Sequence, residues 1–220
     1  MPDLQAVIFD MDGLMIDSEH LHSRSFEIVL NKYGVEPALN KYGIIQTLGI
    51  GVPGNWEKLK KKYQLKPTVA KLTEEKHAAY EKLIPEIKPM SGLKKLLGEL
   101  QKADVKMAVA SGESIKNIKT ILSRLKIDKY FAALVSGEEV KRPKPAPDIF
   151  LRASRHLKID PVYCAVLEDA PSGIQAAKKA NMAAVAVLSE FNHGNKFKTA
   201  DAVYNSLAEI SLTKLKKLKA

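Results

Sequence analysis

The sequence predicts an α/β fold: a Rossmann-like, doubly wound parallel sheet core into which an α-helical domain is inserted. Three observations predict it. Short apolar runs recur along the 220-residue chain, helical patterns separate most of these runs, and one long segment before Ser91 carries helical patterns alone. Alternation of strands and helices is typical of a parallel sheet with helices on both faces.

Five apolar runs have the length of strands, at residues 6–9, 107–110, 133–135, 164–167 and 183–188. The runs are continuous rather than alternating, which is typical of parallel strands that are buried on both faces. Cys164 begins the fourth run, and we expect it to be a buried small hydrophobic residue rather than a nucleophile.

Apolar residues between these runs repeat with the 3.6-residue period of a helix. A stripe of four leucines follows Ser91, which we expect to be the N-cap of that helix. Ser114 opens a similar stripe. We expect a third helix over residues 172–181, where Asn181 suits a left-handed C-terminal position.

The segment between the first strand and Ser91 is far longer than a crossover between parallel strands needs. It carries one helical stripe that ends at Gly34, and we expect further helices over residues 56–63 and 73–83. We expect Trp56 to pack in the core of this segment. The domain boundaries that follow are a Rossmann-like core of residues 1–16 and 88–220 and a helical cap domain of residues 17–87.

Composition excludes several classes of protein. Hydrophobic residues make up 45% of the chain, yet the chain contains no run of about 18 apolar residues, which a membrane span needs. Asp3 and the lack of a basic region before an apolar stretch argue against a signal peptide. Cys164 is the single cysteine, so an intramolecular disulfide and a multi-cysteine zinc site are excluded. We therefore expect a cytoplasmic protein.

The formal net charge of +10 could attract nucleic acid or small anionic substrates. Aromatic residues make up only 6% of the chain, so it supplies few rings on which the bases of a single strand could stack. We therefore favour a lysine-rich, solvated surface and expect no nucleic-acid partner. A non-catalytic, basic nucleic-acid-binding protein stays open as an alternative.

Polar side chains follow the apolar runs at the points where the predicted strands end. Because ligands of an open parallel sheet bind outside the carboxyl ends of its strands, these side chains are candidates for one site. Gathered carboxylates repel one another and favour a hard cation such as Mg²⁺, while a hydroxyl and a lysine suit a phosphate. The set predicts phosphoryl transfer, and its members are Asp10, Asp12, Ser111, Gly112, Lys144, Glu168 and Asp169.

Four segments in this order resemble the motifs of the haloacid dehalogenase superfamily. They are Asp-Met-Asp-Gly at residues 10–13, Ser-Gly at 111–112, Lys-Pro-Ala-Pro-Asp at 144–148 and Glu-Asp-Ala-Pro-Ser-Gly at 168–173. The helical insertion after the first motif is similar to the cap of the β-phosphoglucomutase-like branch. The resemblance covers nearly the whole chain.

The resemblance implies a role for each carboxylate. Asp10 would be the nucleophile that forms an aspartyl-phosphate, and Asp12 would protonate the leaving oxygen and then activate water. The Asp10 carboxylate, the Asp12 carbonyl and Asp169 would hold Mg²⁺, with Glu168 as a supporting ligand. Dehalogenating relatives lack a carboxylate at the position of Asp12, so the resemblance implies phosphate chemistry.

The resemblance also implies how phosphate is bound. Ser111 and the amide of Gly112 would bind the phosphoryl oxygens, and Lys144 would neutralise them. In the cap, His22 and Lys76 resemble residues of β-phosphoglucomutases and are expected to contact substrate.

The sequence thus predicts a Mg²⁺-dependent phosphatase, a monomer that hydrolyses a small phosphorylated metabolite, either a sugar phosphate or a nucleotide. A phosphomutase of the β-phosphoglucomutase type is the alternative, although residues 49–56 contain no basic residue and Arg24 is the only arginine of the cap. Residues 49–54 match the dinucleotide pattern G-x-G-x-x-G, but no second strand follows, so we expect a cap loop there.

Overall fold

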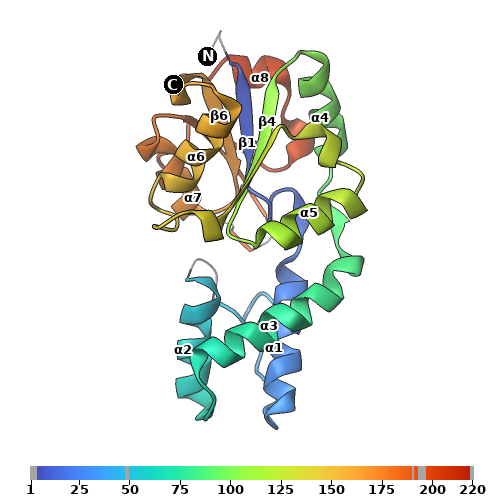
Figure 1. The fold of residues 1–220 in the computed structure, drawn as a ribbon, viewed down its shortest axis with the longest axis vertical. Coiled ribbons are helices and arrows are strands. Elements are labelled where there is room, and N and C mark those ends of the chain that lie inside the picture. The colour runs from blue at the N-terminus through green and yellow to red at the C-terminus, as the bar shows by residue number, and fades with distance from the viewer. Residues whose placement is uncertain (1–3, 48–49, 190, 193–196, 219–220) are drawn as a thin grey trace. The chain divides into compact units, whose positions relative to one another are not determined.

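The structure is a computed structural model, and it describes residues 4–47, 50–189, 191–192 and 197–218. Tertiary contacts divide the chain into two compact units, which are Ser18–Ile87 and the combination of Met1–Asp17 with Lys88–Ala220. Figure 1 labels the helices of both units. Within the described ranges, no helix is both long and apolar enough to cross a membrane.

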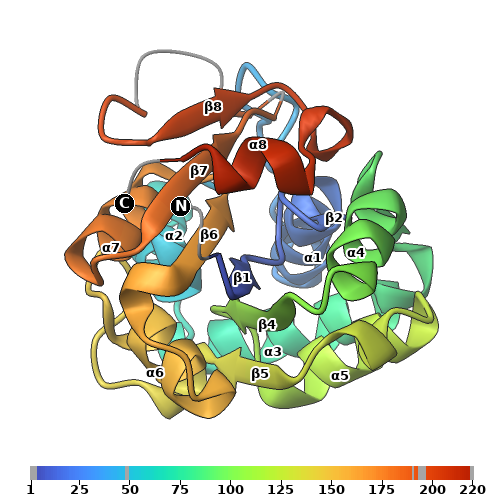
Figure 2. The same cartoon turned by 90° about the horizontal axis from the view of Figure 1, so that it is seen from above.

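The larger unit is built on a six-stranded sheet in the order β5-β4-β1-β6-β7-β8 (Figure 2). Every neighbouring pair in it is parallel. The strands are β1 (Ala6–Phe9), β4 (Lys106–Ser111), β5 (Ala133–Ser136), β6 (Cys164–Glu168), β7 (Ala183–Val187) and β8 (Ala202–Tyr204).

Helices cover both faces of this sheet, as Figure 2 shows. Ala6 and Ile8 of β1 belong to a buried cluster with the apolar residues of α6 and α7. Val7 and Phe9 alternate with them and are also fully buried. The sheet is therefore apolar on both sides. Its helices are α4 (Leu93–Lys102), α5 (Ile115–Arg124), α6 (Asp148–Leu157), α7 (Pro171–Lys179) and α8 (Leu212–Lys216).

Two short strands lie where the chain leaves this unit and returns to it. β2 (Ile16–Asp17) and β3 (Lys88–Pro89) pair antiparallel, so the two crossing points lie side by side. The helical unit can thus be inserted after β1 without separating the strands on either side of it in the sheet.

The smaller unit consists of α1 (Glu19–Lys32), α2 (Gly51–Tyr63) and α3 (Val69–Leu83). Phe26 and Trp56 pack at its centre with ring centroids 4.8 Å apart, and Leu30 and Leu72 are fully buried beside them. The Thr68 hydroxyl accepts a hydrogen bond from the Lys71 amide and caps α3. Short 3₁₀ turns lie at Ile84–Glu86, Asp128–Tyr130, Gly137–Glu139, Pro161–Tyr163 and Leu207–Glu209.

The fold class, the five predicted strands and the buried places of Cys164 and Trp56 are confirmed. Ser114, which opens the second predicted helix, is the N-cap of α5, since its hydroxyl accepts a hydrogen bond from the Asn117 amide, and Asn181 adopts the predicted left-handed conformation with φ 57°.

Two local predictions were wrong. The N-cap of α4 is Gly92 at φ 87° rather than Ser91, and a side chain at Gly92 would overlap the backbone of Ala208. Gly49 lies outside the described residues, while Gly51–Gly54 form the first turn of α2 instead of a loop. Pro53 is accommodated because a helix leaves its first amides without intrahelical partners.

Candidate active site

Strand order places the site. β1 lies between β4 and β6, where the order of winding reverses, and ligands of open α/β sheets bind outside the carboxyl ends of the strands at such a point. Asp10 follows β1 directly, Ser111 ends β4 and Glu168 ends β6. The parallel register therefore delivers these three polar side chains to the same edge of the sheet.

Lys144 joins two of these carboxylates. Its ammonium donates to Asp10 Oδ1 at 2.5 Å and to Glu168 Oε1 at 2.6 Å. It also lies 3.5 Å from the carbonyl oxygen of Ala110, so it contacts the ends of β1, β4 and β6 together. The other Glu168 oxygen accepts the amide of Ala170 at 2.8 Å. Both oxygens of Glu168 are thus held.

Three carboxylates surround one point in this unit. Each of Asp10, Glu168 and Asp169 offers an oxygen, and these oxygens lie within 4.8 Å of one another. Gly13, at φ 75°, has no room for a side chain because the Asp169 carboxylate occupies that space. The backbone after Asp12 therefore lies directly against Asp169. A donor set made only of oxygen suits a hard cation, and Mg²⁺ fits it.

The carboxylates of the site outnumber its one ammonium group, and their crowding changes the pKa values of the groups involved. Burial raises the pKa of Asp10 from 3.8 to about 8, although the Lys144 ammonium opposes the shift, and Glu168 and Asp12 add to it. Burial disfavours the charged form of Lys144, but Asp10 and Glu168 outweigh it and raise the Lys144 pKa. One ammonium among several carboxylates leaves an excess of negative charge, which a divalent cation would neutralise.

Ser111 lies beside the second aspartate of the first motif. Its hydroxyl is 3.4 Å from Asp12 Oδ2 and accepts the Glu113 amide at 3.1 Å. Ser111 is buried, whereas Gly112, the next residue, is exposed at the end of β4. The seven residues predicted from the sequence for the core thus lie at the carboxyl ends of β4 and β6, in the loops that follow β1, β4 and β6, or in the loop that precedes α6.

The profile of the family described as "Haloacid dehalogenase-like hydrolase" matches residues 7–187, most of the chain. The chain belongs to this family. As a haloacid dehalogenase-like (HAD) hydrolase, it has the arrangement of the β-phosphoglucomutase- and CbbY-like members, with a helical cap inserted after the first strand. The resemblance drawn from the four motifs is confirmed.

Relatives of this HAD hydrolase include phosphatases and a mutase. The chain is 31% identical over 205 residues to a "Phosphorylated carbohydrates phosphatase" of Thermotoga maritima, covering 91% of this chain and 93% of the relative. It is 30% identical over 218 residues to "Beta-phosphoglucomutase" of Bacillus subtilis, covering 95% and 92%. The crystal structure of CbbY from Rhodobacter sphaeroides in complex with phosphate superposes with a TM-score of 0.84 at 25% identity, covering 96% and 99%.

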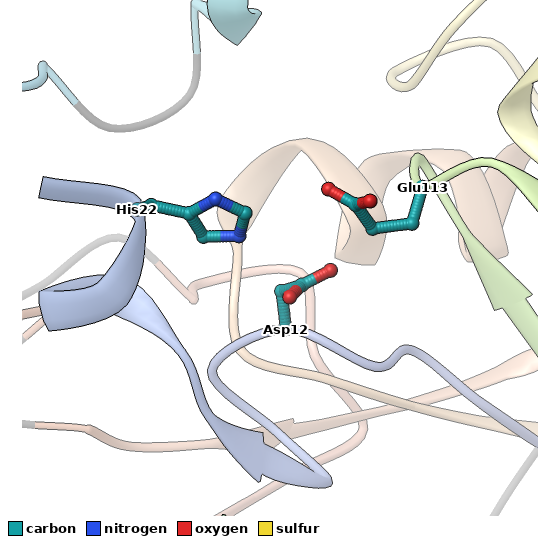
Figure 3. A group of neighbouring side chains, drawn as sticks. All are labelled: Asp12, His22 and Glu113. Carbon is teal, nitrogen blue, oxygen red and sulfur yellow. The ribbon is translucent and has the colours of Figure 1, made fainter. Parts of the chain in front are cut away.

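Glu113 of this HAD hydrolase was missed by sequence reasoning. Its carboxylate lies within 4.8 Å of that of Asp12, and Figure 3 shows the two groups turned toward each other. The amide nitrogen of Asn117 on α5 donates to Glu113 Oε2 at 2.7 Å and holds the side chain in place. Its position two residues after Ser111 does not by itself predict the contact with Asp12.

Asn192 was missed as well. Its side-chain nitrogen donates to the backbone oxygen of Asp169 at 2.7 Å, and its Oδ1 accepts the amide of Ser189 at 2.8 Å. Asn192 thereby ties the segment after β7 to the loop that carries Asp169. An asparagine in a polar segment gives no sequence signal for such a contact.

The two cap residues predicted as substrate contacts lie next to each other in the smaller unit. Lys76 Nζ is 2.8 Å from His22 Nδ1, and the Lys76 ammonium lies 4.8 Å from the centroid of the Tyr80 ring. The imidazole of His22 stacks on Tyr80 at 4.1 Å. Lys76 is fully buried. A contact of either residue with substrate stays a prediction.

Proposed function

We propose that this HAD hydrolase is a Mg²⁺-dependent phosphatase that hydrolyses small phosphate monoesters, with sugar phosphates as its main substrates. The observation that carries the proposal is Asp10 itself: it lies at the switch point of the sheet, in an ion pair with the partly buried Lys144 and beside two further carboxylates. The sugar-phosphate class is supported by the names of relatives, including "Fructose-1-phosphate phosphatase YqaB" of Escherichia coli, 31% identical over 188 residues.

The residues that would hold Mg²⁺ are Asp10, Asp169 and the backbone carbonyl of Asp12. Glu168 takes a supporting place, because one of its oxygens binds Lys144 and the other binds the Ala170 amide. When bound, the cation supplies positive charge that offsets the charge of the phosphoryl group and of these carboxylates.

Hydrolysis then proceeds in two steps. A carboxylate oxygen of Asp10 attacks phosphorus, the bond from phosphorus to the ester oxygen breaks, and the Asp12 carboxyl group donates its proton to the leaving oxygen. In the second step the Asp12 carboxylate takes a proton from water, which attacks the aspartyl-phosphate and releases inorganic phosphate. Asp10 is regenerated.

Three groups of the core stabilise the phosphoryl oxygens during both steps. We assign this role to the Ser111 hydroxyl, the Gly112 amide and the Lys144 ammonium, because groups fixed in advance of the reaction stabilise developing charge most effectively. In the cap, the adjacent His22 and Lys76 side chains supply further polar contacts for the substrate.

A panel of phosphorylated metabolites assayed with Mg²⁺ tests the proposal. Asp10→Asn should lose nearly all release of phosphate while its thermal unfolding stays cooperative. Asp104→Asn is the matched control: Asp104 is exposed, and its left-handed conformation at φ 54° suits asparagine. Turnover retained in Asp10→Asn, or lost equally in both variants, would remove Asp10 from the mechanism.

A phosphomutase is the second candidate, and the match to β-phosphoglucomutase of Bacillus subtilis favours it. The absence of a basic residue from the sequence at 49–56 weighs against a second phosphate being held there. Incubation with β-glucose 1-phosphate separates the two functions. Free phosphate is the product expected of a phosphatase, and an isomerised sugar phosphate would establish the mutase.

Nucleic-acid binding by a non-catalytic protein is tested separately. Such a protein would bind DNA or RNA with an affinity that falls steeply as salt is raised, and it would release no phosphate from the panel.

A further inference from the structure

Glu113 carries a carboxylate that the two-step mechanism does not use. It follows β4 immediately after the two phosphate-binding residues Ser111 and Gly112, and its backbone amide donates to the Ser111 hydroxyl. Its side chain is not a freely moving surface group, because Asn117 Nδ2 donates to Glu113 Oε2 at 2.7 Å and Asn117 is itself buried.

The position of Glu113 relative to Asp12 determines which part of a bound substrate the Glu113 carboxylate can contact. A group that protonates a leaving oxygen must lie within hydrogen-bond reach of it. The carboxylates of Glu113 and Asp12 lie within 4.8 Å of each other and face one another (Figure 3). The first atoms of the substrate beyond the leaving oxygen therefore come within reach of the Glu113 carboxylate.

We propose that Glu113 is a specificity-determining residue that selects a neutral, hydroxyl-bearing leaving group and rejects one that carries a second anionic group. This inference rests on the proposed function and deepens it. A carboxylate has only acceptor oxygens, so it binds the hydroxyl groups of a sugar or polyol. Its charge repels a second phosphate or a carboxylate on the same substrate, and in a partly buried site this repulsion is weakly screened.

Direct binding separates this inference from the catalytic proposal. Asp10→Asn serves as the parent, since a parent without the nucleophile binds ligand without consuming it. Calorimetric titration in Mg²⁺ with fructose 1-phosphate and with fructose 1,6-bisphosphate gives the ratio of the two affinities. The same titrations are repeated after adding Glu113→Gln, which keeps the size of the side chain and an acceptor for Asn117.

The control adds Glu138→Gln to the same parent. Glu138 is an exposed glutamate after β5 whose carboxylate accepts the backbone amide of Ile115, so this variant removes an equal charge from the same end of the sheet. Thermal unfolding of each variant establishes that it is folded.

We expect Glu113→Gln to raise the affinity for the bisphosphate relative to the monophosphate by about tenfold or more, and Glu138→Gln to leave the ratio within about twofold. An unchanged ratio in Glu113→Gln, an equal change in Glu138→Gln, or no binding of either sugar phosphate would overturn the inference. Failure of the catalytic proposal is detected by a different measurement, the absence of phosphate release by the native enzyme in the metabolite panel.

Discussion

The carboxyl group of Glu168 occupies the space in which a side chain at Gly173 would begin. Glu168 ends β6, and Gly173 lies in the first turns of α7. The glycine therefore lets the carboxylate lie against the helix, where it meets the Lys144 ammonium and the Ala170 amide. The short loop between β6 and α7 depends on this close approach.

Gly173→Ala tests that dependence, with Gly98→Ala as its matched control. Alanine is favoured over glycine inside a helix by about 1 kcal/mol, and nothing lies within 4 Å of a methyl group at Gly98 on α4. Gly98→Ala should therefore raise the free energy of unfolding by about 0.5–1 kcal/mol. Gly173→Ala should lower it by about 1–3 kcal/mol, because the methyl group displaces Glu168.

Urea unfolding measures both free energies, and phosphate release measures turnover. Turnover should fall in Gly173→Ala and stay unchanged in Gly98→Ala. Equal stabilisation of the protein by both substitutions would contradict the close contact between Glu168 and residue 173.

Lys144→Met removes the one ammonium that joins Asp10 and Glu168 while keeping an unbranched side chain. Removing one partner of a buried ion pair typically costs about 3–5 kcal/mol of stability, so we expect a loss of this order in metal-free protein. Mg²⁺ should restore part of it by supplying the missing positive charge. Turnover should fall by about 10²-fold or more.

Urea unfolding with and without Mg²⁺ measures the stability change. Lys141→Met is the control, since Lys141 is exposed three residues earlier in the same loop and its charge is solvated. Equal effects of the two substitutions would show that stability depends on the net charge of the loop and not on the contacts of Lys144.

Most of the core fold could be predicted from the sequence because its strands are buried on both faces. The apolar runs at 6–9 and 164–167 needed no tertiary information. β8 was not predicted because it is short and none of its three residues is fully buried. Its pairing with β7 also depends on the rest of the sheet being formed. α6 was not predicted, although its sequence has a clear apolar face formed by Ile149, Phe150, Ala153 and Leu157.

The candidate site likewise contains residues that could be predicted from the sequence and residues that could not. Residues such as Asp10 and Lys144 were predictable because each belongs to a motif that is read along the chain. Glu113 and Asn192 were not, since their roles come from contacts between separate loops. Contacts between the loops at this edge of the sheet depend on the tertiary structure, and motifs in the sequence do not predict them.

Asn192→Ala should weaken Mg²⁺ binding. The lost hydrogen bond fixes the backbone oxygen of Asp169 and so positions the residue whose carboxylate would hold Mg²⁺, and loss of such a supporting contact typically costs about 10–100-fold in affinity. Calorimetric titration of Mg²⁺ measures the dissociation constant without any assay of activity. Asn205→Ala, at an exposed asparagine that binds Glu209, is the control and should leave the constant unchanged. A dissociation constant in Asn192→Ala equal to that of the native protein would refute the role.

Cys164 should be unreactive in the folded protein. The thiol is fully buried, and burial, with a contribution from Asp160, raises its pKa from 9.0 to about 12. The thiolate is the reactive form, so at pH 8 a disulfide reagent such as Ellman's should label no cysteine on the timescale of minutes. In urea one equivalent should react per chain, because Cys164 is the single cysteine. Rapid labelling without denaturant would contradict the buried place of β6.

Mg²⁺ affinity should depend on pH through Asp10. In the metal-free protein the pKa of Asp10 is raised from 3.8 to about 8, so below pH 8 its carboxyl group holds a proton that the cation must displace. Affinity should therefore fall as the pH falls below 8, by up to about tenfold per pH unit, and binding should release close to one proton. The rise in thermal stability on adding Mg²⁺ should accordingly be larger at pH 8.5 than at pH 6.5.

Calorimetry at pH 6.5 in two buffers of different ionisation enthalpy counts the protons released. Asp10→Asn removes the titrating group, so any residual binding by this variant should release fewer protons and vary less with pH. A dissociation constant that is the same at pH 6.5 and 8.5 in the native protein would mean that Asp10 is already ionised before the cation binds. The ion pair with Lys144 would then outweigh the burial of the carboxylate and its repulsion by Glu168 and Asp12.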